Sequence, residues 1–314
     1  MSTRHLLDPE LLALVDGFPD LSFGPDDILK TRALLNDAMA KQAPLPAGVA
    51  REERWIPGLD GEPDVRCLVY RHDATPDGAP AYLHMHGGGY VSGSPDGVEP
   101  RNARIAAECG CLVVSVDYRL APEHPFPAAR DDAYAVLAWL HNDTAALRID
   151  PARIGVGGES AGGGLAACLA LTARDQGDYP IALQVLVNAM LDERSGGPDA
   201  PGDPLLGEYI WRRQDNQDAW AAYLGGAPAV APAVPARAED LAGLPPTWVS
   251  TAALDLFLDE DIAYARRLLA AGVKTEMRVY PAACHSYSLA RESAVARRFE
   301  NDYLDAIRRG LGTV

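Results

Sequence analysis

The stretch GGESAGG at residues 157–163 decides the fold, and it directly follows the apolar run Ile-Gly-Val at 154–156. The run has the composition of a short buried strand, and the residues after the stretch are typical of a helix. A serine on so tight a strand-to-helix turn keeps its hydroxyl exposed, and only small neighbours leave room for the turn. The segment therefore predicts Ser160 as a nucleophile. A glycine-rich phosphate cradle is the alternative, but Glu159 would repel a phosphate.

Outward from this stretch, short apolar runs alternate with helical segments. Strands are expected at 53–57, 64–71, 81–86, 112–117, 154–158, 183–188, 247–252 and 276–280. Helices are expected at 103–108, 128–142, 161–174, 259–271 and 292–309. This alternation predicts an α/β fold with a mostly parallel eight-stranded sheet flanked by helices.

Two segments fall outside the alternation. Residues 1–50 have helical spacing, with helices expected at 9–15 and 26–41, and residues 192–242 contain no strand candidate. We expect both to form a helical cap over the carboxyl edge of the sheet, where open α/β sheets place their sites; a solvent-exposed excursion is the alternative for the second. The expected organisation is thus an N-terminal cap (1–50), a catalytic α/β domain in two parts (51–191 and 243–314) and a cap insertion (192–242).

A serine hydroxyl needs a base, and in this architecture the base follows the serine and an acid along the chain. Of the seven histidines only His285 follows Ser160. It lies in a loop just after the last expected strand, at the edge where a site on top of the sheet would need it. The sequence therefore predicts His285 as the base.

Several carboxylates could serve as the acid. Asp255 lies in the turn after the strand expected at 247–252. Asp259, Glu260 and Asp261 begin the next helix, where acids cap the backbone and interact favourably with the helix dipole. We therefore expect Asp255 to be the acid and the other three to serve the helix terminus.

Charge that develops on a substrate carbonyl oxygen needs preorganised donors. The stretch HMHGGGY at residues 84–90 follows the third expected strand and offers successive glycine amides. Together with the amide of Ala161 they could form an oxyanion hole. His84 and His86 share one strand face and could bind a metal, but no third ligand is apparent, so no metal is expected.

Charge and composition exclude several functions. The chain has 44 acidic and 28 basic residues, which gives a net charge of −16. This charge would repel nucleic acid and anionic lipid. No run approaches the ~18 apolar residues of a membrane span. The five cysteines form no C-x-x-C pair, and the N-terminus has acids where a signal peptide needs an apolar core. We expect a cytoplasmic protein with reduced thiols. Association as a homodimer is left open as an alternative to a monomer.

Taken together, HGGGY (86–90), DYRLAPE (117–123) with FPAA (126–129), GESAGG (158–163), Asp255 and His285 resemble the hormone-sensitive-lipase family of bacterial carboxylesterases. The resemblance covers roughly residues 50–310 and implies the α/β-hydrolase fold with an N-terminal helical cap. It implies a serine carboxylesterase that hydrolyses short- to medium-chain acyl esters of small molecules, without a cofactor. A lactone hydrolase or an amidase would use the same intermediate. A non-catalytic receptor, like the plant gibberellin receptors that lack a working triad, is disfavoured by His285.

The resemblance also implies roles for individual residues. The triad would be Ser160, Asp255 and His285, and the oxyanion donors would be Gly88, Gly89 and Ala161. Further candidates for the substrate pocket are Gly87, Tyr90, Glu159, Asn188, Tyr209 and Trp211.

This chain departs from the family pattern in three places. Many members have Asp where this chain has Glu159. The segment Asn188-Ala189-Met190 replaces the usual proline-bearing strand end, which would reshape the acyl pocket. Cys284 beside His285 is also unusual, and the sequence suggests no role for it.

Overall fold

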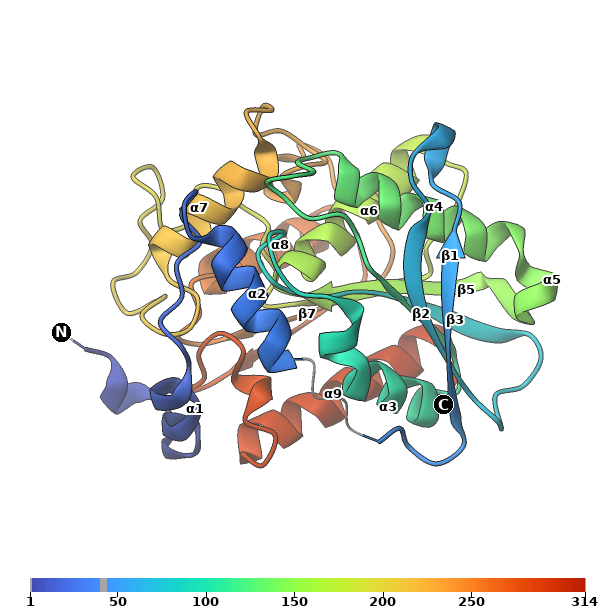
Figure 1. Ribbon diagram of the computed structural model, residues 1–314, viewed down its shortest axis with the longest axis horizontal. Helices are drawn as coiled ribbons and strands as arrows, with labels where there is room; N and C mark the ends of the chain where they lie inside the picture. Colours follow the sequence, from blue (N-terminus) through green and yellow to red (C-terminus); the bar gives the residue numbers. More distant parts are fainter. Residues whose placement is uncertain (1, 40–43, 314) are drawn as a thin grey trace.

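One sheet of eight strands forms the centre of the protein (Figure 1). The structure is a computed structural model that describes residues 2–39 and 44–313. The strand order is β1-β2-β4-β3-β5-β6-β7-β8. β2 runs antiparallel to β1 and β4, and the remaining neighbours pair in parallel, which confirms the predicted sheet. The strands are β1 (Val49–Ile56), β2 (Val65–His72), β3 (Ala79–Met85), β4 (Leu112–Val116), β5 (Ile149–Glu159), β6 (Leu183–Val187), β7 (Thr247–Ala252) and β8 (Thr275–Tyr280).

Strand composition follows position in the sheet. β3, β4, β6 and β7 are buried along their whole length, as strands covered on both faces must be. The edge strands β1 and β8 instead expose charged side chains, which discourages pairing with a further strand. The strands in the interior of the sheet are therefore more apolar and more buried than the two edge strands.

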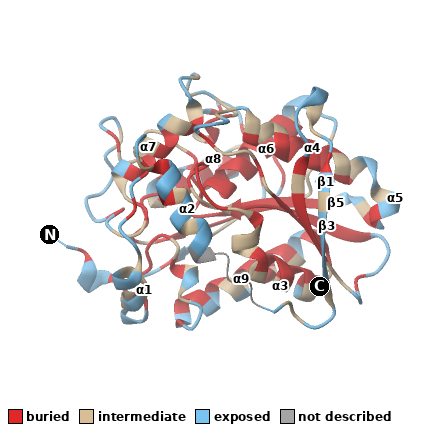
Figure 2. Cartoon of the chain, viewed as in Figure 1, coloured by how far each residue is buried: buried red, intermediate tan, exposed pale blue. Residues whose placement is uncertain are grey.

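Helices cover both faces of the sheet, and the buried colour in Figure 2 gathers on the strands and on the helix sides that face them. α3 (Glu99–Cys109) and α9 (Ala294–Leu311) pack on one face. α4 (Ala128–Asn142), α6 (Ala161–Gln176) and α8 (Leu258–Ala270) pack on the other, and α5 (Thr144–Leu147) is short. The five predicted helices are all present. α3 begins four residues earlier than expected, because Pro100 is tolerated in a first helical turn.

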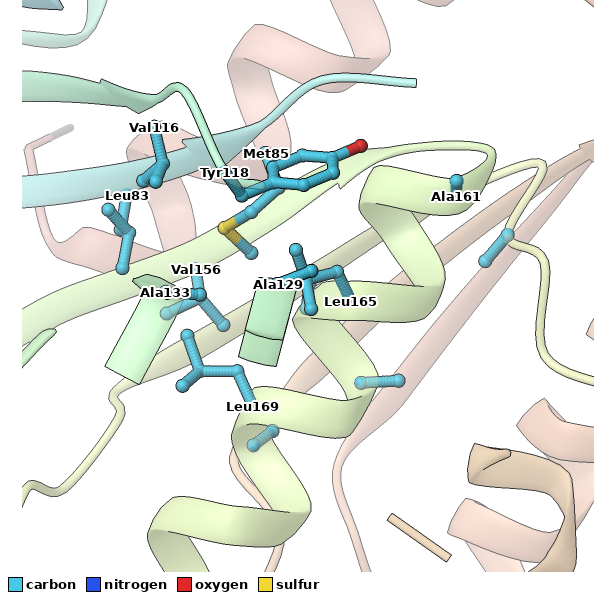
Figure 3. Close-up of a cluster of buried hydrophobic side chains, with 14 of the residues drawn as sticks. Leu83, Met85, Val116, Tyr118, Ala129, Ala133, Val156, Ala161, Leu165 and Leu169 are labelled. Carbon is cyan, nitrogen blue, oxygen red and sulfur yellow. The ribbon is translucent and has the colours of Figure 1, made fainter. Parts of the chain in front are cut away.

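The core on the α6 side is shown in Figure 3. Side chains from three neighbouring parallel strands meet small and branched side chains from α4 and α6 there. They include Leu83, Met85, Val116, Val156, Ala129, Ala133, Leu165 and Leu169. This packing fixes the start of α6, and with it the residue that joins β5 to α6.

The N-terminal helices α1 (Leu12–Gly17) and α2 (Ile28–Met39), together with α7 (Arg213–Leu224), lie on the side toward which β5 points (Figure 1). α2 matches the helix predicted at 26–41, whose last two residues lie outside the described part of the chain. Single 3-10 turns occur at Arg4–Leu6, Pro9–Leu11, Leu59–Gly61, Pro95–Val98, Pro235–Arg237 and Tyr287–Leu289. The domain boundaries given above stay predictions.

Candidate active site

Ser160 joins β5 to α6 in a backbone conformation that non-glycine residues rarely adopt, with φ 56° and ψ −121°. The end of β3 passes so close that a Cβ on Gly158 would lie 2.2 Å from the Met85 carbonyl oxygen, and one on Gly162 would lie 2.1 Å from it. A side chain at either position would clash with the backbone of β3, so both residues must be glycine. The amide of Ser160 donates to the Val187 carbonyl at 2.8 Å, which ties the turn to β6. The predicted turn is present, with its serine hydroxyl at the sheet edge.

The structure brings Ser160, His285 and Asp255 together from three loops that follow β5, β8 and β7. Ser160 Oγ lies 3.1 Å from His285 Nε2, and His285 Nδ1 lies 2.7 Å from Asp255 Oδ2. With Nδ1 protonated, the imidazole donates to Asp255 and Nε2 accepts from the serine hydroxyl. Asp255 is fully buried, and its Oδ1 accepts the amide of Phe257 at 3.0 Å. This chain of hydrogen bonds can carry a proton away from Ser160.

The other acids that are close to Asp255 in the sequence have different surroundings. Asp259 is exposed in the first turn of α8. Glu260 and Asp261 are buried and hold the loop after β6: Glu260 accepts the Leu191 amide at 2.6 Å, and Asp261 accepts the Ala189 amide at 3.2 Å. All three acids lie in the first turn of α8 as expected. The expectation that they cap the helix backbone is wrong for Glu260 and Asp261, because their carboxylates accept amides of the loop after β6. Burial raises the pKa of both carboxyls well above the ordinary range.

The glycine loop after β3 lies against the nucleophile. A Cβ on Gly87 would be 3.4 Å from the Ser160 Cβ. Gly88 and Gly89 have φ of +124° and +63°, and a Cβ on Gly89 would lie 2.4 Å from the Trp211 ring, so larger residues do not fit. Among the described residues, the amides of Gly88, Gly89 and Ala161 donate to no protein acceptor. Ala161 also begins α6, whose dipole favours negative charge at this end.

Glu159 lies beside the nucleophile and lines the cavity over it. Its carboxylate contacts His84 Nε2 at 3.0 Å and accepts from Arg101 Nη1 at 2.8 Å. Burial raises the pKa of Glu159, but His84 and Arg101 lower it more, to about 2, so the group is ionised. Arg101 in turn donates to Glu300 at 2.6 Å. No sequence pattern pointed to Arg101, because its partner Glu159 lies 58 positions away.

The two histidines considered for a metal site have other partners. The ring of His84 contacts Glu159 and, at 3.3 Å, the side chain of Asn102. His86 stacks on Tyr118 with ring centroids 4.2 Å apart. Burial lowers the pKa of His86 to about 4, so its ring is neutral. Both side chains therefore support the loop next to the nucleophile.

A cavity of about 170 Å³ opens onto Ser160 and His285. Of the residues proposed for a substrate pocket, Gly87, Glu159, Asn188 and Trp211 line it. Its remaining apolar lining was not anticipated and comes mainly from the N-terminal segment, through Phe18, Leu21, Phe23 and Leu35. Their only signal in the sequence was apolar character in a segment expected to be a cap.

Two aromatic residues expected in the pocket are elsewhere, and those expectations are corrected here. The ring of Tyr90 is buried and stacks on Tyr223 of α7, with centroids 3.8 Å apart. Tyr209 packs against a small apolar cluster formed by Leu7, Leu254 and Cys284, and its hydroxyl lies 3.2 Å from that of Ser2. Both rings therefore pack against other side chains, and neither lines the cavity.

Cys284 is buried among apolar side chains next to His285. Burial raises the pKa of its thiol to about 12. A thiol that stays protonated is a poor nucleophile and behaves as a small apolar side chain. The structure therefore gives Cys284 a packing role.

In the described residues, no helix is long and apolar enough to cross a bilayer.

Comparisons with known proteins agree with this geometry. Residues 82–289 match a family model described as alpha/beta hydrolase fold. The carboxylesterase NlhH of Mycobacterium tuberculosis is 36% identical over 296 residues, which cover 90% of this chain and 89% of that protein. The esterase LipI of the same organism is 35% identical over 90% of this chain and 88% of its own length. Among solved structures, a bacterial heroin esterase superposes with a TM-score of 0.92 at 41% identity, over 99% of both chains.

The family model spans well over half of the chain, and the curated relatives cover nearly all of it. The matched region runs from β3 to the 3-10 turn after His285, so it contains the glycine loop, the strained serine and both partners of that serine. This chain therefore belongs to the alpha/beta hydrolase fold family and is a carboxylic ester hydrolase of its hormone-sensitive-lipase branch.

Proposed function

We propose that Ser160, His285 and Asp255 are the catalytic triad of this serine carboxylesterase, and that its substrates are short- to medium-chain acyl esters. The observation that carries the proposal is the hydrogen-bonded chain from Ser160 Oγ through His285 to Asp255, at 3.1 and 2.7 Å. The serine at the start of this chain lies next to three backbone amides that donate to no protein acceptor among the described residues. A nucleophile, a base, an orienting acid and oxyanion donors are the parts that acyl transfer requires.

The reaction follows from these positions. His285 Nε2 takes the proton of Ser160 as Oγ attacks the ester carbonyl carbon, and Asp255 stabilises the resulting imidazolium. The carbonyl oxygen becomes negative and accepts hydrogen bonds from the amides of Gly88, Gly89 and Ala161. His285 then protonates the departing alcohol, which leaves an acyl-enzyme. Water, activated by the same histidine, releases the acid and restores Ser160.

Ester hydrolysis is favoured over the alternatives. Lactone and amide hydrolysis would pass through the same tetrahedral intermediate. The names of the relatives, a carboxylesterase and two esterases, support an ester as the preferred substrate. The complete arrangement of Ser160, His285 and Asp255 speaks against a non-catalytic receptor.

The test is replacement of the nucleophile. Ser160→Ala should lower kcat for p-nitrophenyl butyrate by several orders of magnitude, on the order of 10⁴-fold or more, with an unchanged circular dichroism spectrum. Ser22→Ala, which removes the same hydroxyl from an exposed position, is the matched control. An organophosphate should label the wild-type enzyme at Ser160 by mass spectrometry. Labelling elsewhere, with Ser160→Ala still active, would overturn the mechanism.

Two expectations stay predictions: a cytoplasmic location and association as a homodimer. The five cysteines are free and buried, which supports a reducing compartment.

A further inference from the structure

A second cavity, of about 370 Å³, adjoins the candidate active site beside α3 and α9. The two helices lie side by side in Figure 1. The second cavity shares four lining residues with the first, namely Val98, Arg101, Ser288 and Leu289. Two of these follow His285 closely in the chain. The two cavities are therefore neighbours, with Arg101 and Leu289 among the residues that line both.

Four arginines line this second cavity, against a single carboxylate. We name it the arginine groove and define it by Arg101, Arg104, Arg291, Arg297 and Glu300. The chain as a whole has a net charge of −16. In so acidic a protein, a cluster of arginines next to the candidate active site is a local feature. A general need for charge on the surface, to keep the protein soluble, does not explain it.

Part of this positive charge is neutralised within the protein. Glu300 contacts Arg101 at 2.6 Å and Arg104 at 3.7 Å. Arg101 also contacts Glu159, and Arg104 also contacts Glu108 at 2.7 Å. Three carboxylates thus surround these two guanidinium groups and hold them in place. They form the rigid floor of the groove.

The other two arginines are exposed and weakly paired. Arg297 lies 3.7 Å from the carboxylate of Glu292, whose side chain is fully exposed, so water screens that pair. Arg291 forms no ion pair with any residue that the structure describes. Glu159, Glu108 and Glu300 surround Arg101 and Arg104, and the exposed Glu292 lies beside Arg297. Arg291 is therefore the arginine of the groove that has no carboxylate partner among the described residues.

We propose that the arginine groove binds a carboxylate carried by the ester substrate while the ester carbonyl lies at Ser160. The proposal rests on the proposed function. A guanidinium offers a planar pair of N–H donors that matches the two oxygens of a carboxylate. Arg291 and Arg297 are the exposed guanidinium groups of the groove that such a carboxylate can reach. The substrate class is then an ester with an apolar part under the cap and an acidic group on one arm.

Matched ester pairs test this. For an anion on the acyl arm, mono-p-nitrophenyl adipate is compared with p-nitrophenyl hexanoate, which has the same chain length, after the spontaneous rates are subtracted. For an anion on the alcohol arm, 4-acetoxybenzoate is compared with 4-methylphenyl acetate. The quantity measured is the ratio of kcat/KM for the charged ester to that for its neutral partner. The pair whose ratio falls when the groove arginines are replaced identifies the arm that carries the carboxylate.

The variant is Arg291→Gln combined with Arg297→Gln. Its matched control is Arg148→Gln combined with Arg278→Gln, which removes the same charge from two exposed positions outside both cavities. The groove variant should lower the ratio for one pair by about tenfold, and the control should leave it within about twofold. In the wild type, raising the salt from about 0.02 M to about 0.5 M should also lower the ratio, since exposed charges are screened.

An equal ratio in the groove variant and the control, for both ester pairs, would overturn the arginine groove as a carboxylate site. Hydrolysis of the neutral esters by the wild type separates this result from a failure of the proposed function. If the wild type hydrolyses no neutral ester, the proposed function fails. If it hydrolyses them and only the ratio is insensitive to the arginines, the groove alone fails.

Discussion

The side-chain amide of Asn188 donates to Asp255 Oδ2, the same oxygen that accepts the hydrogen bond from His285 Nδ1 at 2.7 Å. Asn188 follows β6, and its own amide donates to the Ser250 carbonyl of β7 at 2.7 Å. With the Phe257 amide on Oδ1, the buried carboxylate has three donors. A fully buried carboxylate needs such donors, because burial removes its water. Asn188 is thus a positioning residue for Asp255 as well as a wall of the cavity.

Asn188→Ala should lower kcat for p-nitrophenyl butyrate by about 10- to 100-fold and change KM much less, because Asp255 loses a donor on the oxygen that orients His285. Steady-state kinetics of the folded variant measure this split. Asn142→Ala, at an exposed position near the end of α4, is the control. If the loss appeared in KM alone, Asn188 would only shape the pocket.

Asp255→Asn should lower kcat by on the order of 10⁴-fold, because an amide neither fixes the required His285 tautomer nor stabilises its protonated form. Asp259→Asn makes the same chemical change at an exposed carboxylate four residues away and should leave kcat within about twofold. Nearly full activity in Asp255→Asn would move the acid to another carboxylate, with Asp259 and Glu260 as the first candidates.

Trp211→Ala should shift the acyl-chain preference toward longer esters. Trp211 lines the cavity, and its ring lies 5.1 Å from that of Phe23 and 6.1 Å from that of His285. In the wild type, kcat/KM of p-nitrophenyl esters should peak at about four to six acyl carbons, because each further CH₂ gains at most about 0.8 kcal/mol and a steric wall cancels it. Removal of the indole should move the peak by about two carbons or more. A profile identical to that of Trp139→Ala, which changes a tryptophan outside the cavity, would show that Trp211 sets no limit.

Asp261→Asn should stabilise the protein increasingly as the pH rises. Burial first, and then the carboxylates of Glu260 and Asp255, raise the pKa of Asp261 well above its ordinary value. An acid with a raised folded-state pKa gives its full stabilisation below the unfolded-state pKa of about 3.9 and loses it as the pH rises through the folded-state pKa. The loss reaches at most about 1.4 kcal/mol for each pH unit in that window. Asparagine keeps an oxygen for the Ala189 amide and does not titrate.

Urea unfolding of Asp261→Asn and wild type at about pH 5 and about pH 8 measures the effect as a difference in free energy of unfolding that grows with pH. Asp259→Asn, at the exposed neighbouring carboxylate, should show no such growth. Parallel stability curves for Asp261→Asn and wild type would mean that Asp261 is ionised in the folded protein.

Features that depend on neighbours along the chain could be predicted from the amino-acid sequence. The turn at Ser160 requires small residues at 158 and 162 because β3 passes within 2.2 Å of where their Cβ atoms would be. Continuous apolar runs predict buried parallel strands, and the chain order of serine, acid and histidine places three loops at one sheet edge. The glycines and the apolar runs are local in sequence, and the order of Ser160, Asp255 and His285 can be followed along the chain. These signals could therefore be recognised before any packing was known.

Which side chains meet across the sheet edge depends on packing and could not be predicted from the sequence. Asn188 reaches Asp255 across 67 positions, and Arg101 reaches Glu159 across 58. Tyr90 packs on Tyr223 instead of facing the cavity, and Asp261 turns toward the loop after β6 instead of the helix end. The direction in which a polar or aromatic side chain points depends on the partners that folding brings within about 3–4 Å, and residue type alone does not specify those partners. Strand and turn propensities act over a few residues, whereas these contacts form only once the whole sheet and its helices are packed.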